Sequence, residues 1–102
     1  MESLIERIRS RAARVGVIGM GYVGLPLMVA AAERGFRVTG IDTNEDKVKQ
    51  INAGQNYNED VSDTQLATLV AEGGITATTD YSTIRDLDVI VICVPTPLNL
   101  NK

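Results

Sequence analysis

Three glycines, Gly19, Gly21 and Gly24, follow a short apolar run in the segment VGVIGMGYVGLPL, residues 15–27. Their spacing is G-x-G-x-x-G, and the apolar run before them predicts a buried strand. Glycine costs conformational order, so three of them at fixed spacing indicate that the backbone must turn sharply or let something approach closely. Between a strand and a helix, such a turn can bind a diphosphate through free N–H groups and the positive end of the helix dipole.

Each glycine has a separate predicted role in such a turn. Gly19 permits the sharp turn, Gly21 lets the backbone approach a pyrophosphate, and Gly24 lets the following helix pack closely on the strand. Pro26 lies near the first turn of that helix, where a missing N–H does least harm. The loop thus predicts the phosphate-binding part of a dinucleotide site.

A carboxylate stands where a dinucleotide site would need one. Asp42 ends the second apolar segment, RVTGID, 18 residues after Gly24. There it can accept both hydroxyls of an adenosine ribose and would repel the extra phosphate of NADP, so the pair of features predicts NAD. The alternative makes Asp42 a turn residue or the cap of the next helix. Thr43 and Asn44 could provide that cap equally well.

The elements that must position these residues alternate along the chain. Strands are predicted at residues 14–18, 37–41, 75–78 and 88–94, and helices at 2–13, 22–34, 44–52, 62–72 and, as a single turn, 81–85. This alternation predicts an α/β fold with a Rossmann-type parallel sheet in the order 3-2-1-4. The polar third strand suits a sheet edge, and the apolar fourth suits a strand covered on both faces. The amphipathic first helix should pack beside the first strand.

Composition limits the possible functions. The chain has 102 residues, no histidine, one cysteine and a formal net charge of −3. This length supports one domain, and the acidic balance argues against a nucleic-acid partner. The lack of histidine removes His-based nucleophile pairs, and with only one cysteine a zinc site is not expected. No signal peptide or membrane-length apolar run is visible, so a cytoplasmic protein without a membrane partner is expected.

Two further features could be mistaken for catalytic groups. Cys93 lies in the apolar fourth strand, where a small buried thiol is the ordinary outcome, and we do not expect it to be catalytic. Glu59 and Asp60 form an acidic pair in YNEDVSD. They fit a polar loop ahead of a helix capped by Ser62, although contact with a substrate in an intact enzyme is an alternative.

Several segments together resemble the UDP-glucose/GDP-mannose 6-dehydrogenase family. They are GVIGMGYVGLPL, VTGID, NEDVSD and TATTDYSTIRDLDVIVICVPTPL, and they span residues 14–98. The likeness is greatest to the bacterial branch acting on UDP-N-acetylhexosamines, typified by UDP-N-acetyl-D-glucosamine 6-dehydrogenase. G-Y-V-G-L-P and V-P-T-P are far more specific than the glycine spacing alone.

The resemblance implies roles for individual residues. The segment Gly21, Tyr22, Val23, Gly24 would line the pyrophosphate, and Asp42 would bind the ribose with help from Lys47. Lys47 could equally be a solvated helix lysine. Thr96 of V-P-T-P would contact the cofactor, while the prolines around it could simply end the strand.

The resemblance also implies an activity for a longer protein. Family members oxidise the primary alcohol of a nucleotide sugar to a carboxylate with two NAD, using a second domain that carries the catalytic cysteine and lysine. Residues 1–102 would then be the amino-terminal part of the NAD-binding domain, inactive alone and without catalytic residues of their own. We expect a homo-oligomer. The alternatives are a stand-alone module that senses nicotinamide nucleotides and a fragment of a hydroxyacid dehydrogenase.

Overall fold

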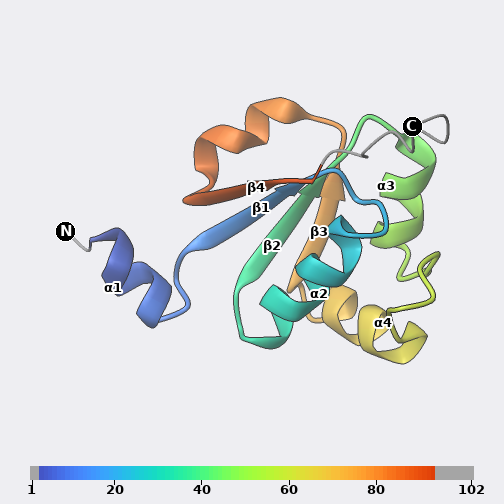
Figure 1. Ribbon diagram of the computed structural model, residues 1–102, viewed down its shortest axis with the longest axis horizontal. Coiled ribbons are helices and arrows are strands. Elements are labelled where there is room, and N and C mark those ends of the chain that lie inside the picture. The colour runs from blue at the N-terminus through green and yellow to red at the C-terminus, as the bar shows by residue number, and fades with distance from the viewer. Residues whose placement is uncertain (1–2, 94–102) are drawn as a thin grey trace, which may run out of the picture.

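The computed structural model describes residues 3–93 of the chain. Strands and helices alternate along it, as Figure 1 shows. The strands are β1 (Arg14–Ile18), β2 (Arg37–Ile41), β3 (Ile75–Thr78) and β4 (Val89–Ile92). The helices are α1 (Leu4–Arg9), α2 (Gly24–Glu33), α3 (Glu45–Asn52), α4 (Asp63–Ala71) and the 3-10 helix η1 (Tyr81–Asp86). Apart from ends that differ by a few residues, these are the predicted elements.

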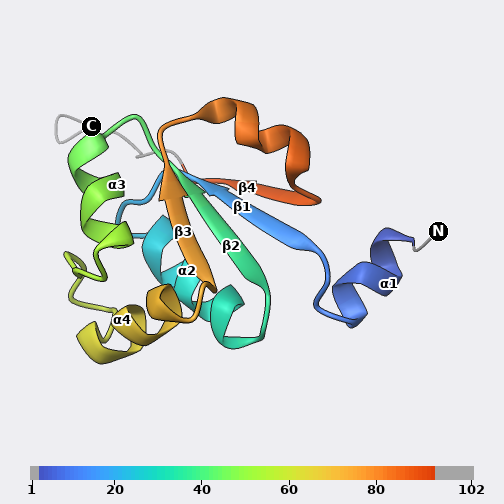
Figure 2. The same ribbon diagram turned by 180° about the vertical axis from the view of Figure 1, so that it is seen from behind.

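The four strands form one parallel sheet in the order β3-β2-β1-β4, which confirms the predicted topology. In its register, Val15 pairs with Val38 on one side and with Val89 on the other. Figures 1 and 2 show α2, α3 and α4 on one face of the sheet and η1 on the opposite face. All four strands therefore direct their carboxyl ends to the same edge, where the glycine loop begins.

Side-chain caps fix where most of the helices start. Asn44 accepts hydrogen bonds from the first turn of α3, Ser62 does so for α4, and Ser3 makes a reciprocal capping box with Glu6 in α1. Such caps satisfy N–H groups that have no partner within a helix. Helix α2 is different, because its N-cap residue is Val23 and no side chain caps it.

The hydrophobic core fills the space between the sheet and the helices α2, α3 and α4. Its fully buried side chains include Met20, Leu25, Met28, Ile41, Ile51, Leu66 and Ile75. Gly40 of β2 makes room for two of them, because a Cβ at that position would lie 2.4 Å from the Met20 sulfur and 2.6 Å from Met28 Cε. The buried side chain of Met20 thus anchors the glycine loop to the hydrophobic core.

The first helix departs from the prediction of a segment packed beside β1. It ends at Arg9, it has no buried residue, and Ile5 is 63% exposed. The chain turns away after it through Arg11, which has a φ of 67° and donates from Nε to the carbonyl oxygen of Arg34 at 2.8 Å. Figure 1 accordingly shows α1 projecting from one end of the sheet. Arg7 links α1 to the residue before β4 through a 2.9 Å ion pair with Asp88.

The expectation of a fourth strand covered on both faces is wrong for the described residues. Ile90 is 39% exposed and Ile92 is 66% exposed, whereas Val89 and Val91 are half-buried. The strand is uniformly apolar, yet the only described helix beside it on this face is the short η1 (Figure 1). Within residues 3–93, β4 is therefore an edge strand with one exposed apolar row.

Candidate cofactor-binding site

The glycine loop leaves β1 through two contacts too close for any side chain. Gly19 has a φ of +95°, and a Cβ there would lie 1.9 Å from the carbonyl oxygen of Cys93. A Cβ on Gly24 would lie 1.8 Å from the carbonyl oxygen of Gly19. The predicted reasons for these two glycines, a sharp turn and close packing of helix on strand, are thus visible in the backbone.

Gly21 differs from both, because a Cβ there would meet nothing within 4 Å. No described neighbour would clash with a side chain at this position. The space beside Gly21 is therefore open to a ligand. The neighbouring side chains face outward, with Tyr22 79% and Val23 70% exposed. Among the described residues, the backbone N–H groups of these three residues have no hydrogen-bond acceptor.

These donors, which have no acceptor within residues 3–93, lie where α2 begins. This helix has no side-chain cap and no acid in its first turn. Unpaired N–H groups and the positive end of the helix dipole together favour an anion. The open space at Gly21 lets such an anion approach the backbone. The residues present therefore fit the diphosphate of a dinucleotide.

Asp42 lies directly against this loop. Its Oδ2 accepts a hydrogen bond from the N–H of Met20 at 2.9 Å, and its Oδ1 accepts one from the N–H of Asn44 at 2.9 Å. The carboxylate thus joins the end of β2 to the glycine loop and also shapes the turn into α3. Asn44 provides the cap of α3, so Asp42 is a turn residue but is not needed as the helix cap.

Two residues that the sequence did not single out hold the other side of the loop. The Tyr57 hydroxyl donates to the carbonyl oxygen of Met20, and the Asn58 amide Nδ2 donates to that of Tyr22 at 3.2 Å. Asn58 is only 2% exposed. No local pattern marks these residues, because their partners lie more than 30 positions earlier; only the short polar segment NYN suggests that the loop has a structural role.

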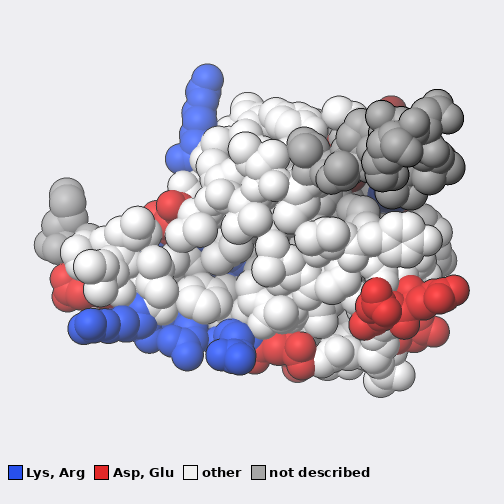
Figure 3. Space-filling model, viewed as in Figure 1, with Lys and Arg blue, Asp and Glu red and all other residues white. Residues whose placement is uncertain are grey.

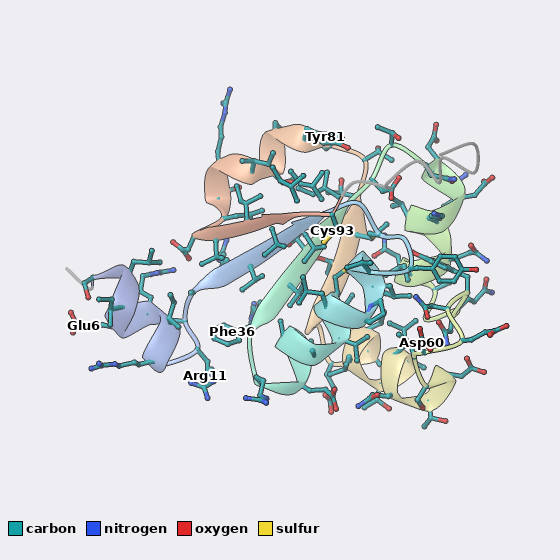
Figure 4. All side chains as sticks on the ribbon, in the orientation of Figure 1. Glu6, Arg11, Phe36, Asp60, Tyr81 and Cys93 are labelled. Carbon is teal, nitrogen blue, oxygen red and sulfur yellow. The ribbon has the colours of Figure 1, made fainter. Side chains whose placement is uncertain are left out.

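The remaining predicted residues occupy varied positions. Lys47 places its Nζ 5.6 Å from the centre of the Tyr57 ring. Thr96 lies outside the described residues. Cys93, just after β4, is half-buried against the core beside Gly19. Asp60 is exposed in the loop before α4 (Figure 4).

Two features of other protein classes are absent from the described part of the chain. Within residues 3–93, no cluster of three or more acidic or cysteine side chains is placed to hold a metal ion. Within that range, no helix is both long enough and apolar enough to span a membrane.

Comparison with known proteins identifies the family. The model of the NAD-binding domain of the UDP-glucose/GDP-mannose dehydrogenase family matches residues 13–102. The chain belongs to this family. The strand order agrees with this family, and NAD is the cofactor of its NAD-binding domain.

Individual relatives agree with this assignment. The chain is 46% identical over 85 residues to an uncharacterized protein of Methanocaldococcus jannaschii, matching 81% of the chain and 9% of that protein. It is 36% identical over 90 residues to the UDP-N-acetyl-D-mannosamine dehydrogenase of Methanococcus aeolicus, matching 87% of the chain and 20% of the enzyme. These names differ from the expected likeness to a UDP-N-acetyl-D-glucosamine dehydrogenase, while the family agrees.

A solved structure gives the same result. The GDP-mannose dehydrogenase of Pseudomonas aeruginosa, determined as a ternary complex, superposes with a TM-score of 0.75 and 33% identity. The match covers 86% of the chain and 21% of that enzyme. The chain thus spans about a fifth, or less, of the length of these relatives.

Proposed function

We propose that the chain provides the NAD site of an enzyme that oxidises the primary alcohol of a UDP-N-acetylhexosamine to the carboxylate. Each molecule of sugar would consume one water and reduce two NAD. The observation that carries this proposal is the open, uncapped glycine loop with the Asp42 carboxylate held against it. Bound NAD would accept the hydride, and the residues described here would bind and orient it.

Asp42 retains the capacity to bind a ribose. An ionised carboxylate has about four acceptor positions, and the two backbone N–H groups use one on each oxygen. The remaining positions can accept the two hydroxyls of the adenosine ribose. Lys47, near Tyr57, would add a positive charge close to the ribose, and Thr96 would contact the cofactor beyond β4.

The substrate class rests on the relatives rather than on the described site. The matched proteins are named for UDP-N-acetyl-D-mannosamine, UDP-glucose and GDP-mannose. Most of the named sequence relatives are UDP-N-acetylhexosamine enzymes, which favours this class of sugar. A stand-alone NAD-sensing module remains the alternative from another functional class, and a cysteine-bearing second domain encoded in the same reading frame would exclude it.

Titration of the purified chain with NADH and NADPH tests the cofactor assignment. We expect preferential binding of NADH, and in Asp42→Ala a loss of NADH affinity of about tenfold or more, since a charge-assisted hydrogen bond contributes about 1.5–3 kcal/mol. Because Asp42 also bonds two backbone N–H groups, this variant should lose some thermal stability. Asp86→Ala, on η1, is the matched control.

The preference for NADH over NADPH distinguishes the ribose-binding role of Asp42 from its structural role in the loop. Asp42→Asn keeps one acceptor oxygen but removes the charge, so the preference for NADH over NADPH should narrow. An unchanged preference would contradict the ribose assignment.

The same chain should produce no NADH from NAD and UDP-N-acetylglucosamine. Its 102 residues contain no histidine to act as a base, and the only thiol, Cys93, is half-buried against the core. Turnover that disappears in Cys93→Ser would overturn this expectation.

A further inference from the structure

The backbone of the glycine loop is held by three side chains at two positions of the G-x-G-x-x-G segment, one on each side of Gly21. Asp42 accepts from the N–H of Met20, Tyr57 donates to the carbonyl of the same residue, and Asn58 donates to the carbonyl of Tyr22. Two of these groups come from one segment, residues 55–61, which we call the buttress loop. It connects α3 to α4 and lies beside the glycine loop.

The buttress loop is itself rigidly bonded. The Asn58 side chain accepts from the N–H of Asp60 at 2.8 Å, and the N–H of Asn58 donates to the Asn56 side chain at 2.9 Å. Asn58 is buried, and its amide has the hydrogen-bond partners that a buried polar group requires. Tyr57 packs its ring against the hydrophobic core. The hydroxyl and amide donors therefore have fixed positions.

Fixing a carbonyl also fixes the next N–H. In a trans peptide the C=O and the N–H of the following residue point in opposite directions, and no described peptide bond is cis. With the Met20 carbonyl bonded to Tyr57, the N–H of Gly21 must point away from the buttress loop. With the Tyr22 carbonyl bonded to Asn58, the N–H of Val23 must do the same. These are two of the donors that have no described acceptor.

We propose that Tyr57 and Asn58 are positioning residues that aim the Gly21 and Val23 N–H groups at the pyrophosphate of the bound dinucleotide. The inference rests on the proposed NAD site, and it assigns to the buttress loop the preorganisation of that site. Amide donors that are already oriented bind an anion without a further cost of ordering the loop. Burial, and then the nearby charge of Asp42, raise the pKa of Tyr57 to about 12. The hydroxyl therefore keeps its proton, and can donate it in a hydrogen bond, at neutral pH.

Tyr57→Phe tests this with the smallest change, removal of one oxygen. Affinity for NADH and ADP-ribose should fall about three- to tenfold, the range expected for one hydrogen bond. Affinity for adenosine, which has the ribose but no phosphate, should stay within about twofold of the original in an NMR titration. Tyr81→Phe on η1, whose side chain is 40% exposed, is the control and should change neither ligand.

Amide chemical shifts provide a second measurement. Pyrophosphate added to the original chain should shift the Gly21 and Val23 amide resonances, and the shifts should shrink in Tyr57→Phe. A variant that binds ADP-ribose as well as the original chain, or that loses adenosine and ADP-ribose in equal proportion, would overturn the positioning role. If the original chain bound neither NADH nor ADP-ribose, the proposed function would fail first and this inference with it.

Discussion

At the scale of single residues, the glycines of one loop serve two different needs. Gly24 is required by the fold, because its missing Cβ allows the Gly19 carbonyl to lie against the start of α2. Gly21 is not required by any described neighbour, and the space beside it is open. A site that binds a large anion through its backbone needs both kinds of glycine, one to shape the turn and one to leave it accessible.

Substitution of these two glycines should therefore have opposite effects. Gly24→Ala places a methyl group against a backbone oxygen, so we expect a loss of about 3 kcal/mol in the free energy of unfolding, the upper end of the range for an overpacked site. Gly21→Ala should fold with nearly unchanged stability but bind NADH about tenfold more weakly, because the methyl group occupies the approach to the phosphates. Urea denaturation and calorimetric titration measure the two quantities. Full NADH affinity in Gly21→Ala would show that the phosphates do not lie there.

At the scale of elements, helix α3 protects the outer edge of the sheet. Asn52, its last residue, donates from Nδ2 to the carbonyl oxygen of Ala77 in β3 and accepts from the N–H of the same residue, both at 2.9 Å. The side-chain amide thus takes the place of a neighbouring strand at this position. An unpaired edge invites association with other chains, and one paired residue shortens the exposed edge of a four-residue strand.

Removal of this amide should destabilise the domain measurably. Asn52→Ala loses two hydrogen bonds at the edge of β3, so the free energy of unfolding should fall by about 1–3 kcal/mol. Asn52→Asp keeps an acceptor for the Ala77 N–H but places a negatively charged oxygen against the Ala77 carbonyl oxygen, so its effect should be at least as large. Gln50→Ala, on the same helix, serves as the control. Equal stability of Asn52→Ala and the control would mean that water replaces the amide without loss.

The sequence predicted the elements and their order because their signals are local. Apolar periodicity, Asn44 and Ser62 as caps, and the glycines that end helices all act within a few residues. The contacts of Tyr57 and Asn58 with the glycine loop were not predictable, since they join segments more than 30 residues apart and leave no spacing rule. The prediction that β4 is covered on both faces was wrong. Apolar composition shows that a strand can be buried, but it does not show which element packs over it.

At the scale of the whole molecule, charge and apolar surface are unevenly distributed. Figure 3 shows Lys and Arg side chains gathered at the end where α1 projects, and Asp and Glu side chains concentrated toward the end that carries α4 and the loop before it. Besides Tyr22 and Val23 in the glycine loop, two apolar surfaces are exposed. One is the face of α1, with Leu4, Ile5 and Ile8, and the other is the row Ile90 and Ile92 on β4.

We expect the chain to self-associate through β4 rather than through α1. Within residues 3–93 no strand pairs with the outer side of β4, so backbone donors and acceptors stand beside the exposed Ile92. By pairing its own edge strand with β4, a second copy can bond these backbone groups and bury Ile92. The backbone of α1 is already hydrogen-bonded within the helix, so α1 offers only apolar side chains. Sedimentation velocity should show concentration-dependent dimers.

Ile92→Lys should shift the chain to monomer by placing a charge on the paired edge, while Ile5→Lys on the equally exposed α1 should leave the dimer intact. Loss of the dimer in Ile5→Lys alone would assign the contact to α1, and a clean monomer at high concentration would contradict association altogether.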